Sequence, residues 1–161
     1  MWLENPIFHR DLEKIASAEY IPWNDLREKT VLVTGATGLI GHTLVSALLY
    51  TSRKRGLKLT VLALVRSEAR ARELFSAQME NSNDLHLLVG TVEVPPRIEG
   101  PVHYIVHGAS QTASEAFVKK PVETIRTALL GTESMLAFAR EKRSEGFVYL
   151  SSMEVYGHPP R

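Results

Sequence analysis

Three glycines at regular spacing are the clearest chemical feature of this sequence. Gly35, Gly38 and Gly41 lie in segment 34–41 (TGATGLIG), which follows a short β-branched run and opens a stretch of helical periodicity. In a strand-to-helix turn, the first glycine permits the tight turn, the second lets the backbone approach a pyrophosphate, and the third lets the helix lie against the strand. Free amides and the helix dipole then bind the anion without a lysine. The segment therefore predicts a phosphate-binding loop.

The spacing of these glycines differs from two related patterns. It reads Gly-x-x-Gly-x-x-Gly, whereas the dehydrogenase fingerprint reads Gly-x-Gly-x-x-Gly, and it lacks the Gly-Lys-Ser/Thr of nucleotide-triphosphatase loops. The pattern leaves one alternative open, which is a glycine-rich turn that binds no ligand.

The loop belongs to a regular alternation of apolar runs and helical patterns. Short apolar runs predict strands over 31–34, 59–65, 85–90, 102–107 and 147–151. Helical patterns cover 39–54, 67 to about 80 with Ser67 as N-cap, and a stretch opened by Pro121 that carries Val122, Ile125, Leu129, Thr132 and Leu136 along one side. Buried strands separated by helices indicate a parallel sheet covered on both faces. Right-handed crossovers then give an α/β fold, a doubly wound, Rossmann-like, three-layer α/β/α sheet.

Residues 1–30 stand outside this alternation. Leu12, Ile15 and Ala16 predict a short amphipathic helix, and an apolar lead-in to the first strand follows at 21–23. We expect a helical extension that packs on the Rossmann domain of residues 31–161. A partner-docking arm is the alternative.

The composition is that of one globular domain. A chain of 161 residues can bury one sizeable core but not two. Lys and Arg number 19 against 18 Asp and Glu, and this near-neutral balance argues against a nucleic-acid partner. The absence of Cys excludes disulfide scaffolds and thiolate chemistry. No run has the length and apolarity of a membrane span, and the first ten residues do not resemble a signal peptide, so we expect no membrane partner and a cytoplasmic protein.

The glycine loop resembles the cofactor loop of the extended short-chain dehydrogenase/reductase family, which includes nucleotide-sugar epimerases, dehydratases and decarboxylases. Two later segments agree with this resemblance. Residues 107–110 (HGAS) resemble the family's His-x-Ala-Ala/Ser element beside the cofactor, and residues 151–157 (SSMEVYG) resemble its Ser-Ser/Thr-x-x-Val-Tyr-Gly signature. The resemblance implies an NAD(P) cofactor and a nucleotide-sugar substrate, and it is compatible with a homodimer.

The resemblance also implies roles for individual residues. Those assigned to the cofactor are Gly35, Thr37, Gly38, Leu39, Ile40, Gly41, Arg66, His107, Gly108, Ala109, Ser110 and Ser151. Ser152 would hydrogen-bond the substrate oxygen, and Glu154 stands where decarboxylases and dehydratases of the family carry a catalytic carboxylate. Met153 replaces the Asp of the usual dehydratases, which leaves a decarboxylase, an epimerase or an unusual dehydratase. A strand-end hydroxyl and a surface glutamate remain the alternatives for Ser152 and Glu154.

The choice between NAD and NADP depends on the end of the second expected strand. NAD-specific sites usually have an acidic residue there, whereas an arginine accommodates the 2′-phosphate of NADP. This chain has Arg66 at that place, with Arg70 and Arg72 one helical turn further on, so NADP is slightly favoured over NAD. A solvated arginine is the alternative. Thr91 and His103 also stand where relatives often have Asp near the adenine.

The family's proton-transferring pair, a Tyr with a Lys four residues on, has no good counterpart in this sequence. Tyr50 and Lys54 have the spacing, but they fall at the carboxyl end of the first helix of the fold, about 20 Å from the edge where ligands bind. Tyr156 belongs to the Val-Tyr-Gly signature instead. We therefore expect a catalytically incomplete, amino-terminal fragment of such an enzyme. The alternative is a noncatalytic dinucleotide-binding sensor or interaction module.

No metal site is expected from the histidines. His103 and His107 lie four residues apart on one expected strand, which separates them by about 13 Å, too far to share an ion.

Overall fold

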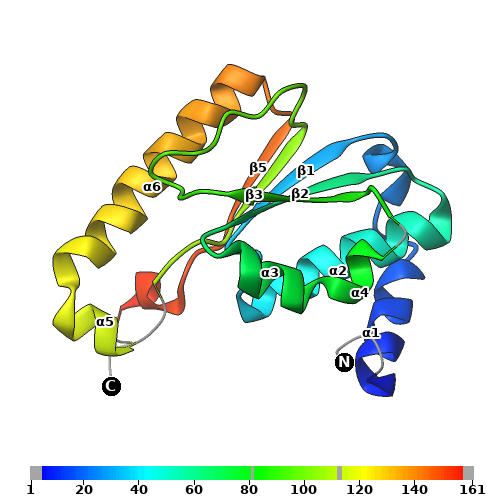
Figure 1. Cartoon of the computed structure of the whole chain (residues 1–161), viewed down its shortest axis with the longest axis horizontal. Coiled ribbons are helices and arrows are strands. Elements are labelled where there is room, and N and C mark those ends of the chain that lie inside the picture. Colours follow the sequence, from blue (N-terminus) through cyan, green and yellow to red (C-terminus); the bar gives the residue numbers. More distant parts are fainter. Residues whose placement is uncertain (1–4, 81, 112–113, 158–161) are drawn as a thin grey trace.

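A computed structural model describes residues 5–80, 82–111 and 114–157, without the side chains of residues 114, 116, 153 and 154. Five parallel strands form one sheet in the order β3-β2-β1-β4-β5 (Figure 1). The strands are β1 (Thr30–Thr34), β2 (Thr60–Val65), β3 (Leu85–Val89), β4 (Tyr104–His107) and β5 (Gly146–Tyr149). The chain moves outward from β1 to β3 and then returns to β4 on the other side of β1. This doubly wound order confirms the predicted fold class and places a topological switch point between β1 and β4.

Helices cover both faces of the sheet. They are α1 (Pro6–Ala16), α2 (Leu39–Arg55), α3 (Glu68–Leu74), α4 (Ser76–Met79), α5 (Ser114–Lys119) and α6 (Pro121–Lys142), with short 3-10 helices η1 (Trp23–Leu26) and η2 (Met153–Tyr156). In Figure 1, α2, α3 and α4 lie on one side of the sheet and α6 on the other. Among the described helices, none combines the length and the apolar character that a bilayer crossing requires.

Each face of the sheet has its own apolar core. Val31 and Val33 of β1 pack with α2 and α3, whereas Leu32 between them faces α6. β2 is buried along both faces, as the apolar run at 59–65 predicts. Side chains in a strand alternate between faces, so one short strand contributes to both cores.

The helix predicted over 67–80 is interrupted at one residue. Ser67 caps α3 as predicted, since its Oγ accepts a hydrogen bond from the Arg70 amide at 3.4 Å. Phe75 then leaves the helical conformation, and its side chain is completely buried in the core below α2. The sequence pattern does not reveal this break, because Phe75 keeps helical spacing with Ala71 and Met79.

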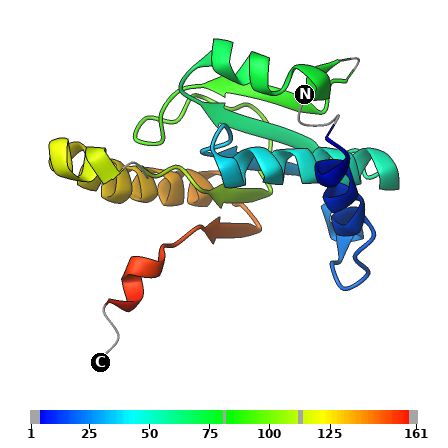
Figure 2. The ribbon, with the colours of Figure 1, turned by 90° about the horizontal axis from the view of Figure 1, so that it is seen from below.

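The side of α6 that packs on the sheet differs from the apolar stripe read from the sequence. Gly131, Met135 and Phe138 face the core. Four residues of the sequence stripe are instead exposed by 49–67%, namely Val122, Ile125, Leu129 and Leu136. Val148 and Tyr149 of the edge strand β5 are also exposed, and Figure 2 shows β5 and η2 at the margin of the molecule, away from α3 and α4. Periodicity identifies an apolar side of a helix but not the layer that covers it.

Candidate functional site

The glycine loop lies between β1 and α2, and two of its three glycines are required by close backbone contacts. Gly35 has a positive φ of 69°, and a Cβ there would lie 2.6 Å from the Gly108 carbonyl oxygen. A Cβ on Gly41 would lie 2.2 Å from the carbonyl oxygen of Gly35. Gly38 is different, because a Cβ there would meet only the Gly35 oxygen, at 3.2 Å. The fold itself therefore explains Gly35 and Gly41, whereas Gly38 borders open space on the outside of the loop.

The start of α2 is left bare. Gly38 is the N-cap and offers no side chain to the first turn, and that turn contains no acidic residue. The two residues that open the helix, Leu39 and Ile40, are 77% and 64% exposed, and Thr37 is half-buried. The first amides of a helix have no intrahelical partner and carry the positive end of its dipole. An anion at this point would meet backbone donors and a favourable potential.

A buried hydrogen-bond chain fixes the ends of β1 and β4 beside this loop. The Thr34 hydroxyl accepts from the amides of Gly108 and Ala109 at 3.2 and 3.1 Å, and it lies 2.8 Å from Nδ1 of His107. Nε2 of His107 lies 3.3 Å from the hydroxyl of Thr132, which donates to the Ala128 carbonyl at 2.6 Å. The donors and acceptors agree if Thr34 donates to Nδ1 and Nε2–H donates to Thr132.

These hydrogen bonds and its burial make His107 a neutral side chain that positions the neighbouring backbone. The imidazole is 1% exposed, and its burial lowers the pKa of His107. The resemblance assigns His107 to the cofactor, but both ring nitrogens have protein partners on β1 and α6. We therefore interpret the side chain as a clamp that holds residues 108–110 against the glycine loop. Sequence reasoning missed its partners Thr34 and Thr132, because no local pattern links them to His107.

The remaining candidate residues follow the carboxyl ends of neighbouring strands. Gly108 and Ala109 are half-buried and Ser110 is exposed after β4, while Ser151 and Ser152 are exposed after β5. β1, β4 and β5 are adjacent and parallel, so the glycine loop, residues 108–110 and both serines share one edge. Figure 1 shows η2 and the start of α2 on this edge. The backbone of Glu154 lies in η2, but its side chain is outside the described residues.

The sequence profile of the NAD dependent epimerase/dehydratase family matches residues 31–161. The chain belongs to this family. The match begins at β1 and runs through the glycine loop, residues 107–110 and the segment after β5, while α1 and η1 precede it.

Several known proteins match this chain over part of their own length. UDP-glucuronic acid decarboxylase 1 of Danio rerio is 29% identical over 153 residues, which are 93% of this chain and 34% of that protein. An uncharacterized membrane protein of Methanocaldococcus jannaschii is 28% identical over 133 residues, 80% of this chain and 38% of that protein. The crystal structure of DesIV, the dTDP-glucose 4,6-dehydratase of Streptomyces venezuelae, with NAD bound, has the same fold, with a TM-score of 0.67 at 23% identity over 82% of this chain and 42% of that chain. This chain therefore spans about a third of the length of these curated relatives.

The Tyr50–Lys54 pair has a different role from the proton-transferring pair of the epimerase/dehydratase family. The Tyr50 hydroxyl donates to Oε2 of Glu13 at 2.5 Å, and the Lys54 ammonium pairs with Oε1 of the same carboxylate. Both side chains thus bind α1 at the end of α2 remote from the glycine loop. The hydrogen bond to Glu13 raises the pKa of Tyr50, which is opposite to the acidification that proton transfer needs. This contact agrees with excluding the pair from catalysis.

Proposed function

We propose that this chain is the dinucleotide-binding part of an NAD(P)-dependent nucleotide-sugar epimerase, dehydratase or decarboxylase that acts by transient hydride transfer. The observation that carries the proposal is the bare start of α2 beside the Gly35–Gly108 contact, at the switch point of the sheet. The amides of α2 would hold the pyrophosphate, and the clamp of Thr34 and His107 would keep residues 108–110 in place beside it. A bound nicotinamide would supply the hydride acceptor.

The catalytic roles rest on the residues after β5. Ser152 is exposed on the edge where the cofactor would lie, and we propose that its hydroxyl orients a substrate oxygen. Glu154 follows in η2 and is proposed as the carboxylate of a decarboxylase-type site. Met153 supports that assignment over an ordinary dehydratase, which would need an Asp at this position.

We expect this chain alone to be inactive. Within the described residues, Tyr50 and Lys54 bind α1, and Tyr156 lies in η2 with its side chain 87% exposed. A phenol needs a neighbouring cation to transfer protons near neutral pH, and neither arrangement supplies one at the cofactor edge.

Two finer features belong to this proposal. Arg66, exposed at the end of β2, would by itself favour NADP, whereas the solved relative DesIV holds NAD. The exposed apolar stripe of α6 is proposed as the contact of a homodimer, because a large apolar patch on a helix is costly in water. Sedimentation of Leu129→Ser beside the unchanged chain tests the dimer: a monomer in both would overturn it.

Calorimetric titration with NAD and with NADP tests the proposed function. Gly38→Val should abolish binding, because its side chain would occupy the space that the pyrophosphate needs. Gly56→Ala, at the other end of α2, is the control: its positive φ of 62° makes it destabilising, but nothing surrounds its Cβ and binding should persist. Equal binding by the unchanged chain and Gly38→Val would refute the loop assignment.

A further inference from the structure

The carboxyl ends of β2 and β3 form one corner of the proposed cofactor site. Val65 pairs with Val89 at the end of the two strands, and the amide of Gly90 donates to the Val65 carbonyl at 3.0 Å. Arg66 and the turn at 91–94 therefore lie side by side. In a Rossmann site a residue near the end of the second strand contacts the adenosine ribose, so a dinucleotide bound here would bring its ribose close to this turn.

A glutamate in this turn is held in place by neighbouring elements. Oε1 of Glu93 accepts from the Thr127 hydroxyl of α6 at 2.6 Å. Val92 is buried against Gly131, where a Cβ would approach Val92 Cγ2 to 2.6 Å, so α6 and the turn are in close contact. The Thr91 hydroxyl accepts from the Val94 amide at 3.4 Å and keeps the turn compact. These contacts fix the half-buried Glu93 carboxylate against α6, at a corner where the charge of Arg66 also acts on it.

The charge on Glu93 is maintained at neutral pH. The hydrogen bond from Thr127 lowers the pKa of Glu93 in spite of partial burial, and its own backbone amide, Thr91 and the charge of Arg66 act in the same direction. The positive Arg66 and a negative Glu93 thus influence each other across the corner. The sequence pattern identified only the positive charge of Arg66 at this corner, whereas the folded chain also holds the negative charge of Glu93 there.

We propose that Glu93 is a specificity-determining residue for the cofactor, which takes the place of the acidic residue missing after β2 and opposes the binding of a 2′-phosphate. The inference rests on the proposed function, since it concerns the ribose end of the same site. Arg66 attracts the 2′-phosphate of NADP, and the fixed carboxylate repels it. NAD carries only hydroxyls at this position, so the carboxylate can accept a hydrogen bond from the ribose. The pair therefore shifts the site toward NAD, against the preference that Arg66 alone suggests.

The test compares dissociation constants for NADP and NAD across three charge variants. Glu93→Gln should lower the ratio of the NADP to the NAD constant by about tenfold at low salt, because one negative charge is removed near the phosphate. The amide of Gln can still accept from Thr127, so the turn should keep its place. Arg66→Gln should raise the same ratio. Glu99→Gln is the matched control, since this exposed glutamate loses the same charge on the same loop and should leave the ratio unchanged.

The outcomes separate this inference from the proposed function. If Gly38→Val abolishes NAD binding while Glu93→Gln keeps the ratio of the unchanged chain, the role of Glu93 is refuted and the cofactor loop stands. A drop of the same size in Glu99→Gln would also refute it, because the effect would then be one of overall charge. If the unchanged chain binds neither dinucleotide, both the proposed function and this inference fail.

Discussion

The two ends of α2 are built in opposite ways. At its start, on the carboxyl edge of the sheet, the helix has a glycine N-cap, no side-chain cap and no acidic residue in the first turn. At its end, on the opposite edge, Gly56 in a left-handed conformation closes the helix, and Arg53, Lys54 and Arg55 occupy the last turn. Cations are favoured at a helix C-terminus by the dipole alone. Here, however, each of the three also binds a particular neighbour.

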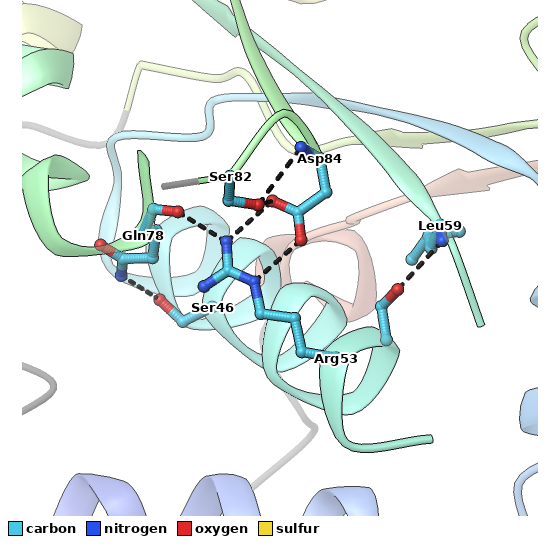
Figure 3. A network of polar contacts seen from close by, with 7 residues as sticks. Ser46, Arg53, Leu59, Gln78, Ser82 and Asp84 are labelled. Atoms are coloured by element: carbon cyan, nitrogen blue, oxygen red, sulfur yellow. Dashed lines mark hydrogen bonds and ion pairs between the residues drawn. The ribbon is translucent and has the colours of Figure 1, made fainter. Parts of the chain in front are cut away.

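These contacts join α2 to its surroundings at the amino edge, which is the side of the sheet where the parallel strands begin. Arg53 donates to both carboxylate oxygens of Asp84 at 2.8 and 2.7 Å and to the Gln78 carbonyl at 2.5 Å, while the Gln78 side chain donates to Ser46 at 3.1 Å (Figure 3). Lys54 pairs with Glu13 of α1, and Nε of Arg55 donates to a carbonyl of α1 at 2.7 Å.

The two ends of α2 therefore serve different purposes: the carboxyl-terminal end attaches the helix to its neighbours, and the amino-terminal end is available to bind a ligand. Side chains satisfy the carboxyl-terminal end of α2 at the amino edge, whereas the carboxyl edge leaves the first amides of α2 available for a ligand. This arrangement agrees with a general rule for open α/β sheets, in which the loops after the carboxyl ends of the strands bind ligands. Substitutions at one end of α2 or the other should therefore have different consequences.

The largest effect is expected from a side chain at Gly41, compared with one at Gly56. Gly41→Ala would place a Cβ 2.2 Å from the rigid carbonyl oxygen of Gly35, so the helix must separate from the loop. We expect a loss of about 3 kcal/mol or more in the free energy of unfolding. Gly56→Ala meets no atom within 4 Å and should lose only about 1 kcal/mol for its left-handed conformation. Urea denaturation measures both, and equal losses would contradict the claim that the loop is packed by backbone contacts.

The next effect concerns the hydroxyl of Thr34. Thr34→Val keeps the shape but removes the acceptor for the amides of Gly108 and Ala109 and the partner of His107 Nδ1. We expect a loss of about 2 kcal/mol in unfolding free energy, because buried polar groups are left unsatisfied, together with weaker NAD binding.

A surface hydroxyl supplies the control for Thr34. Thr43→Val removes a hydroxyl that donates to the Leu39 carbonyl at 3.0 Å within an α2 turn, so it should change stability by less than about 0.5 kcal/mol. If the two variants were equally stable in urea, the hydrogen-bond chain would not be holding the carboxyl edge together.

A third effect, smaller again, is expected at the amino edge. Burial alone would raise the pKa of Asp84, but the hydrogen bonds from Arg53 and Ser82 outweigh it, and the pKa is lowered. Asp84→Asn should therefore cost about 1 kcal/mol of unfolding free energy at neutral pH, a value kept small by solvent screening of the partly exposed pair. NAD binding should be unchanged, because the network lies away from the loop.

The pH dependence of this variant follows from the direction of the shift. A carboxyl group with a lowered pKa in the folded state stabilises the protein above its unfolded pKa, and this contribution is lost as the pH falls through the folded pKa. The difference in stability between the unchanged chain and Asp84→Asn should therefore shrink on acidification below about pH 4. A difference that stays constant from neutral to acidic pH would show that Asp84 contributes through packing instead of charge.

The two edges also differ in how far the sequence predicts them. The glycine loop is local, since three glycines and the flanking strand and helix lie within about a dozen residues, and its place in the fold could be predicted. The central strands β1 and β2 were predictable too, because burial on both faces leaves continuous apolar runs. The clamp was not, because Thr34 and His107 are 73 positions apart and meet only through the pairing of β1 with β4.

At the amino edge, too, the sequence does not reveal which distant residues meet. Tyr50 and Lys54 could be excluded from catalysis by topology alone, but their partner Glu13 lies 37 and 41 positions earlier and is joined to them only by the docking of α1. Likewise, the apolar side of α6 was visible in the sequence, whereas its exposure depends on what covers the helix. Local sequence patterns therefore predict the helices, the strands and the turns between them. Long-range contacts decide which side chains are buried, paired or exposed.

The smallest effect is expected where α1 meets α2. The hydrogen bond to Glu13 raises the pKa of Tyr50, since a carboxylate accepting from the phenol favours its protonated form. Glu13→Gln should lower that pKa toward the ordinary value of about 10, followed by the ultraviolet absorbance of tyrosinate, with Tyr50→Phe identifying the transition. Stability should fall slightly and the loss should disappear in high salt, because the contact with Lys54 is exposed. An unchanged tyrosinate transition in Glu13→Gln would mean that Tyr50 does not bind α1 in solution, and the contrast between a closed amino edge and an open carboxyl edge would then rest on Arg53 and Arg55 alone.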